Sequence, residues 1–246
     1  MKILAIDSSG MTAAAALLED QKLVAEYNIN YKKTHSQTLL PMLDEIRSMT
    51  ELDLASVDFI AVAAGPGSFT GLRIGSATAK GLALALGRPL VEVPTLEGMA
   101  CNVFEADTNI CPMMDARRSQ VYTGVYRFTD DPDAVWGRRL AIKVPQCAVA
   151  VEEIADRLNR LEEPALFLGD GAAVYAQQLR ELVKVPFRFA PPGQCEQRGA
   201  GVAIRAAQLI HEGRVIDGRD HKPEYLRLSQ AERERANRLR EEEEAR

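Results

Sequence analysis

The chain has 246 residues, a length that suits one large or two small domains. Of these residues 46% are hydrophobic and 26% charged, as is typical of a globular protein. It contains no run of about 18 apolar residues, which argues against a membrane-spanning helix, and Asp7 comes too early for a secretory signal. We therefore expect a cytoplasmic protein that has no membrane partner. The formal net charge of −5 argues against a broad nucleic-acid-binding surface but does not exclude local basic patches.

Hydrophobic patterning in the first third of the chain predicts a β-meander, a helix, a strand and a second helix. The first helix should begin close to Ser36 or Thr38, because Pro41 is tolerated only near a first turn. Gly87 should end the second helix. These elements are expected at residues 2–30 for three strands, then at 36–49, 59–64 and 70–86.

The rest of the chain predicts further strands and helices, interrupted by a polar, irregular stretch over residues 129–145. The strands are expected at 90–93, 110–114, 120–126 and 165–168, and the helices at 96–104, 151–161, 172–183 and 198–212.

An early meander followed by two blocks of alternating strands and helices predicts an α/β protein with two related lobes. The N-terminal lobe would span residues 1–104 and be completed by the helix at about 198–212. A smaller second lobe would span 105–197, and a C-terminal segment, 213–246, would end in a charged tail over 230–246. We interpret this tail as a solvated helix or frayed end, although a binding arm is the alternative.

A glycine-rich turn over residues 65–75 lies between the strand at 59–64 and the helix at 70–86. A turn of this kind, between a strand and a helix, is typical of phosphate binding. However, the turn lacks the Lys-Ser/Thr ending of a P-loop, and its glycine spacing is one residue too long for a dinucleotide-binding motif. Small residues continue into the helix at every fourth position, which favours close helix packing over a ligand site. The packing partner could belong to this chain or to another chain; the small residues are Gly71, Gly75, Ala79 and Ala83.

Candidate catalytic groups are few. The chain has only three histidines, and none lies three or four residues from His35, so a metal site is not expected. Asp7 and Ser8 end the first strand where actin-like kinases place a phosphate-binding turn, but Ser9 stands where that turn needs glycine. The Arg117-Arg118 pair could hold a phosphate or a carboxylate, or could form a solvated turn in which Arg117 pairs with Asp115. We predict no catalytic residue and no metal ligand.

Four motifs together resemble the TsaB (YeaZ-type) family of subunits of the bacterial tRNA threonylcarbamoyladenosine machinery. The resemblance runs from residue 1 to about residue 230, with Gln120 at a position where the family often has Glu. The motifs are His35-Ser36-x-x-Leu39-Leu40-Pro41, the turn at 65–75, Asp115-Ala116-Arg117-Arg118 with Val121-Tyr122, and Pro223-x-Tyr225-Leu226-Arg227.

This resemblance implies a two-lobed actin-like ATPase fold (the sugar kinase, Hsp70 and actin class), in which each lobe is a mixed sheet with helices. It also implies a chain that has lost its own catalysis and acts as a scaffold and activating partner of the TsaD subunit. TsaD would transfer the threonylcarbamoyl group to the adenosine next to the anticodon, TsaE, an ATPase, would complete the complex, and tRNA would bind mainly through that complex. The alternative is an actin-like small-molecule kinase or nucleotide hydrolase.

The resemblance further implies that the two helices flanking the glycine-rich turn form the surface shared by a homodimer and the TsaD heterodimer. It implies no cofactor of the chain's own, but ATP or ADP could bind at the junction with TsaD, where Arg73 or Arg117 would contact it. The expected interface residues are Leu39, Met42, Leu43, Ile46, Gly71, Leu72, Gly75, Ser76 and Ala79.

Overall fold

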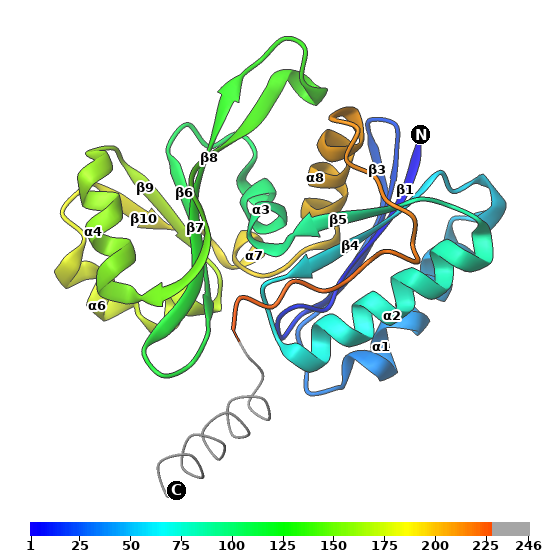
Figure 1. Ribbon diagram of the computed structural model, residues 1–246, viewed down its shortest axis with the longest axis horizontal. Coiled ribbons are helices and arrows are strands. Elements are labelled where there is room, and N and C mark those ends of the chain that lie inside the picture. The colour runs from blue at the N-terminus through cyan, green and yellow to red at the C-terminus, as the bar shows by residue number, and fades with distance from the viewer. Residues whose placement is uncertain (228–246) are drawn as a thin grey trace, which may run out of the picture.

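The computed structural model describes residues 1–227 and contains two lobes, each built on a five-stranded mixed sheet (Figure 1). The strand orders are β3-β2-β1-β4-β5 and β8-β7-β6-β9-β10. In each lobe the central first strand is antiparallel to the second strand and parallel to the fourth. One topology therefore occurs twice. The predicted tail at 230–246 lies outside the described residues.

The first sheet is formed before residue 105, and helix α8 returns to it from near the end of the chain. The lobe boundaries predicted from the sequence, 1–104 and 105–197, remain predictions. The elements of this lobe are β1 (Lys2–Asp7), β2 (Ala13–Glu19), β3 (Lys22–Ile29), α1 (His35–Met49), the 3-10 turn Leu54–Ser56, β4 (Phe59–Gly65), α2 (Phe69–Leu86), β5 (Leu90–Pro94), α3 (Thr95–Ala100), the 3-10 turn Cys101–Val103 and α8 (Gly199–His211).

Alternation along β1 explains why this sheet is covered on both faces. Leu4 and Ile6 point into the core beneath α1 and α2, whereas Ile3 and Ala5 point into the core beneath α8. The helices α3 and α8 lie between the two sheets in Figure 1 and pack against each other. Within residues 1–227, no helix combines the length and the apolar character that crossing a membrane requires.

Helix α1 begins slightly earlier than its sequence suggested. His35 is its first residue, and the Thr34 N–H donates to the Gln37 side-chain oxygen at 3.4 Å, which fixes the start. Pro41 therefore lies in the second turn rather than the first.

The second lobe contains a long hairpin where the sequence indicated an irregular stretch at 129–145. The charged residues of this stretch pair across the hairpin, because Arg138 Nε lies 3.4 Å from Asp130 and Arg139 Nη2 lies 2.7 Å from Asp131. The elements of this lobe are β6 (Asn109–Asp115), β7 (Gln120–Asp130), the 3-10 turn Val135–Gly137, β8 (Arg138–Ala150), α4 (Val151–Leu161), β9 (Ala165–Leu168), α5 (Asp170–Val174), α6 (Ala176–Leu182), β10 (Phe187–Phe189) and α7 (Pro192–Cys195).

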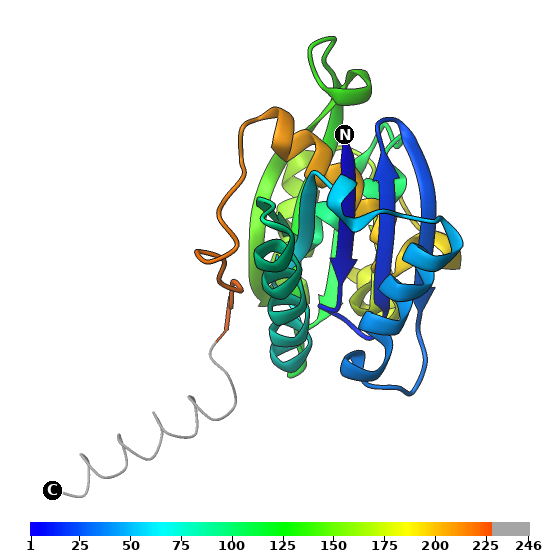
Figure 2. The ribbon, with the colours of Figure 1, turned by 90° about the vertical axis from the view of Figure 1, so that its right-hand side faces the viewer.

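The chain after α8 forms an extended segment, residues 212–227, which we call the C-terminal strap. It pairs with the edge of β5 through reciprocal Leu90–Ile216 hydrogen bonds of 2.9 Å and then runs past α2 (Figure 2). Near its end, the Glu224 N–H donates to the Ala64 carbonyl at 2.7 Å, and Arg227 Nη1 donates to the Ala116 carbonyl at 2.6 Å. The strap therefore connects the first lobe to the second.

Candidate functional site

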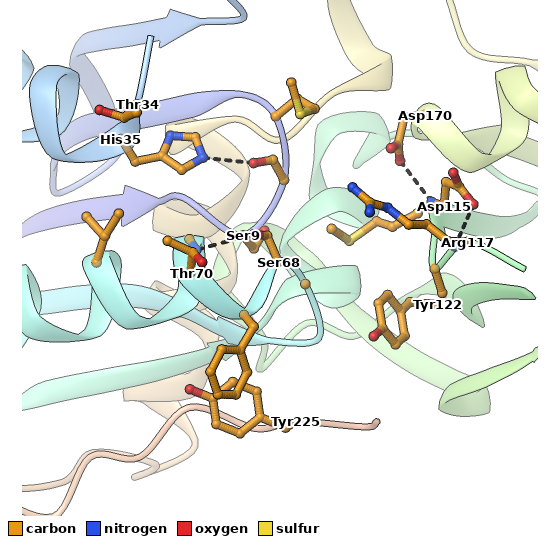
Figure 3. Close-up of a pocket in the computed structure, with 18 of the residues that line it drawn as sticks. Ser9, Thr34, His35, Ser68, Thr70, Asp115, Arg117, Tyr122, Asp170 and Tyr225 are labelled. Atoms are coloured by element: carbon orange, nitrogen blue, oxygen red, sulfur yellow. Dashed lines mark hydrogen bonds between the residues drawn. The ribbon is translucent and has the colours of Figure 1, made fainter. Parts of the chain in front are cut away.

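A pocket of about 790 Å³ lies between the two lobes (Figure 3). The first lobe lines it with the β1–β2 turn, the loop before α1 and the glycine-rich turn at the start of α2. The second lobe contributes the β6–β7 turn and Asp170, and the end of the C-terminal strap closes one side. The motifs that carry the family resemblance therefore meet at one place.

The floor of the pocket on the first-lobe side is closed by hydrogen bonds within the chain. Ser8 Oγ donates to the Gly71 carbonyl at 2.8 Å, and the Ser68 N–H donates to the Ser9 carbonyl at 2.6 Å. Asp7 is buried and accepts the Ser9 N–H at 2.7 Å; burial raises its pKa to about 6. The Ser8 hydroxyl and the Ser68 N–H are thus bonded within the chain, so neither is free to bind the phosphate of a nucleotide.

Gly71 and Gly75 lie against Ser8 of this same chain. A Cβ atom on Gly71 would lie 2.0 Å from the Ser8 carbonyl oxygen, and one on Gly75 would lie 2.5 Å from Ser8 Oγ. The stripe of small residues thus allows α2 to approach the β1–β2 turn. Of the two partners that the sequence left open, the structure shows the internal one.

The residues predicted for the partner interface are buried within the chain, so their side chains do not form its outer surface. They belong to the faces of α1 and α2 that pack on the first sheet, because helical spacing places their apolar positions toward the nearest core. The buried residues are Leu39, Met42, Leu43, Ile46, Gly71, Leu72, Gly75, Ser76 and Ala79.

Arg117 lies at the β6–β7 turn, on the second-lobe side of the pocket (Figure 3). Its backbone N–H donates to Asp115 Oδ1 at 2.8 Å, but within residues 1–227 its guanidinium group is in no ion pair. The predicted pairing with Asp115 therefore involves the backbone. Arg117, Arg118 and Ser119 all have left-handed backbone conformations, with φ of 61°, 58° and 57°, which are costly for residues other than glycine.

Arg73 does not line the pocket but contacts two residues that do, Phe69 and Tyr225. Its guanidinium carbon lies 4.0 Å from the centre of the Phe69 ring, and its Nε donates to the Tyr225 hydroxyl at 3.4 Å. The Phe69 and Tyr225 rings are themselves 4.6 Å apart. The structure thus places Arg73 in an aromatic stack with the C-terminal strap, while Arg117 lies on the opposite lobe. The sequence motif around Tyr225 marked this segment, but its spacing gave no indication of the contact.

A buried histidine holds the C-terminal strap on α2. The imidazole of His221 lies 2.8 Å from Ser76 Oγ through Nε2 and 2.6 Å from Glu92 Oε1 through Nδ1. The hydrogen bond from His221 holds the pKa of Glu92 below its ordinary value. This Ser-His-Glu row has the order of a hydrolase triad, but Ser76 is only 5% exposed and His221 only 1%. A substrate cannot reach the serine. We therefore interpret Ser76, His221 and Glu92 as a structural contact that holds the strap on α2, and call it the latch.

Replacing His221 with Ala should therefore free the strap. We expect a loss of about 2 kcal/mol in the free energy of unfolding, because Ser76 Oγ and one side of Glu92 lose a buried partner. Limited proteolysis should also cut within residues 212–227 faster. Lys222→Ala is the matched control, since the exposed Lys222 contacts Glu92 only through its backbone N–H. Equal proteolysis of the two variants would contradict the latch.

Two lobes of the same sheet topology, with a pocket between them, define a protein of the two-lobed actin-like ATPase fold. This confirms the fold class that the resemblance implied. A protein-family model described as TsaD, tRNA N6-adenosine threonylcarbamoyltransferase, matches residues 22–234. The solved structure of YeaZ from Pseudomonas aeruginosa superposes with a TM-score of 0.75 at 26% identity, covering 92% of this chain and 99% of that one.

Named relatives narrow this assignment. The tRNA threonylcarbamoyladenosine biosynthesis protein TsaB of Bacillus subtilis is 35% identical over 234 residues, which cover 94% of this chain and 96% of the relative. The TsaB protein of Escherichia coli is 28% identical over 230 residues, covering 92% and 95%. The chain belongs to the TsaB family, within the wider group that the TsaD family model covers, and the resemblance seen in its sequence is confirmed.

Proposed function

We propose that the chain takes part in the biosynthesis of threonylcarbamoyladenosine in tRNA as a non-catalytic scaffold that activates a TsaD-type transferase. The names of its relatives support the pathway. The observation that supports the scaffold role most directly is the closed floor of the pocket. Ser8 and Ser9 bond to the glycine-rich turn, and the buried Asp7 bonds to Ser9, where an enzyme of this fold would hold phosphate.

The docking surface that we propose is the outward face of α1 and α2. The inward faces of these helices are committed to the core, whereas Leu40 on α1 and Leu84 on α2 remain 58% and 53% exposed. The two helices pack side by side in front of the first sheet (Figure 2). A specific complex needs roughly 1,200–2,000 Å² of buried surface in total, which two adjacent helices can supply. A TsaD-type partner and a second copy of this chain would compete for this same face.

The proposed complex also includes a nucleotide and a TsaE-type ATPase. We propose that ATP or ADP binds at the junction with the TsaD-type partner, where a phosphate group would contact Arg117 in the pocket or Arg73 beside Phe69. A TsaE-type ATPase would join the complex formed by the two paralogues. tRNA modification would then require this chain without being catalysed by it.

Leu40→Glu tests the docking face. Because Leu40 is exposed, the variant should fold normally yet bind a purified TsaD-type partner at least 10-fold more weakly, and tRNA modification should fall with it. Leu23→Glu is the matched control, since Leu23 on β3 is 42% exposed and pairs with Leu18, which belongs to the core on the α8 face of the sheet. Size-exclusion chromatography and a tRNA modification assay give the two readouts. Undiminished complex formation by Leu40→Glu, or ATP turnover by the isolated chain, would refute the proposal.

A further inference from the structure

Four cations collect at the mouth of the inter-lobe pocket, although the chain as a whole is acidic. Lys32, Lys33, Arg117 and Arg227 line the pocket, and none of them forms an ion pair within residues 1–227. Unpaired cations occur elsewhere in the described chain, for example Arg160 and Arg188, but here four of them line one pocket. The mouth therefore holds positive charge that the described chain leaves free.

The pocket has only two carboxylates to oppose these four cations, Asp115 and Asp170. Asp115 Oδ1 already accepts the Arg117 N–H and the Tyr175 hydroxyl, at 2.8 and 3.2 Å. Asp170 Oδ1 accepts two backbone N–H groups, from Asp115 and Gly171. Both carboxylates hold the β6–β7 turn in place and do not bind the free cations. Arg227 is anchored through the Ala116 carbonyl, which leaves its charge uncompensated.

Aromatic side chains lie among these cations. Tyr31, Phe69, Tyr122 and Tyr225 line the same pocket, which takes three of the six tyrosines of the chain. Tyr31 is 68% exposed, so it does not serve the hydrophobic core. Tyr225 presents a ring that is fixed from behind by Phe69 and Arg73. Aromatic rings and unpaired cations that line one pocket are an arrangement that proteins use to stack bases and hold their phosphates.

We propose that the mouth of this pocket binds a single-stranded segment of RNA. Phosphate groups would bind Lys32, Lys33 and Arg117, and unstacked bases would lie against Tyr31 and Tyr225. A concave pocket can take in a splayed base, whereas an A-form duplex keeps its bases stacked inside and would meet only the rim. The identity of that RNA as tRNA rests on the proposed function, but binding itself needs only the isolated chain.

Fluorescence anisotropy of the full chain with a labelled anticodon stem-loop, titrated at several salt concentrations, tests this proposal. Lys32→Gln/Lys33→Gln should weaken binding at least 5-fold, and the slope of log K against log salt should fall by about 1.4, since each phosphate contact to a single strand contributes about 0.7. Tyr31→Leu should weaken binding at least 5-fold while leaving that slope unchanged. Lys184→Gln/Arg188→Gln is the control that removes two exposed charges outside the pocket, and its binding should be unchanged.

Three results would overturn the proposal. The intact chain could fail to bind the RNA at low salt, or the two double variants could lose affinity equally. A poly-glutamate peptide or millimolar ATP could displace the RNA while Tyr31→Leu has no effect, which would assign the mouth to an acidic protein segment or to free nucleotide. Because no partner protein is present, none of these results depends on the docking face. Failure of Leu40→Glu to disrupt the complex would likewise leave the RNA result standing.

Discussion

Gly71→Ala should destabilise the isolated chain by about 3 kcal/mol, whereas Gly81→Ala in the same helix should stabilise it by about 0.5–1 kcal/mol. A Cβ atom on Gly71 would lie 2.0 Å from the carbonyl oxygen of Ser8, which is backbone and cannot rotate away. A Cβ atom on Gly81 would meet nothing within 4 Å, so the alanine there gains helix propensity without a clash. The free energies of unfolding in urea compare the two variants directly.

This pair also separates two interpretations of the glycine-rich helix. If the small-residue stripe received a second subunit, the isolated chain would tolerate alanine at both positions, and only complex formation would suffer at Gly71. If the stripe receives the β1–β2 turn, as the contacts of Ser8 indicate, the loss appears in the monomer. Equal stability of the two variants would contradict the internal packing.

Much of the first lobe follows from local patterns in the sequence. The small-residue stripe and Gly87 predict α2, and Gly87 indeed ends it with a φ of 63°. The continuous apolar run at residues 3–6 predicts a buried strand, and β1 is buried. Such features depend on periodicity and on residues that permit special backbone conformations, so neighbours in the sequence suffice to predict them.

The pocket depends on contacts that local patterns do not record. His221 meets Ser76 and Glu92 across 145 and 129 residues, and no spacing rule connects three such positions. The interface residues remain a prediction, although in the single chain they are buried against its own sheet. Helical periodicity finds the apolar side of α1 and α2 but cannot tell whether that side faces the chain's own sheet or a partner. The sequence did not predict the long β7–β8 hairpin, because the charged residues that pair across its strands resemble the polar residues of a loop when only the sequence is considered.

Asp7→Asn should change the pH dependence of stability more than any other single substitution that we consider. The pKa of Asp7 is raised from 3.8 to about 6 because the carboxyl is buried. Between these two pH values the folded chain holds a proton that the unfolded chain releases, so the stability of the native chain falls as pH rises through this window. One pKa unit corresponds to about 1.4 kcal/mol, so the full effect is about 3 kcal/mol.

The variant should therefore become more stable relative to the native chain by about 2.4 kcal/mol as the pH rises from 4 to 7, because part of the full effect falls below pH 4. Comparing the two chains at each pH removes the fixed cost of burying an amide, and Asn can still accept the Ser9 N–H through Oδ1. Asp44→Asn is the control, because it makes the same change of carboxylate to amide at an exposed position beside Arg47. Urea unfolding at pH 4, 5, 6 and 7 gives the curve. If the difference in the free energy of unfolding between Asp7→Asn and the native chain does not change with pH, water or a cation reaches this carboxyl group. The β1–β2 turn would then be open to a polar ligand, as an actin-like catalyst requires.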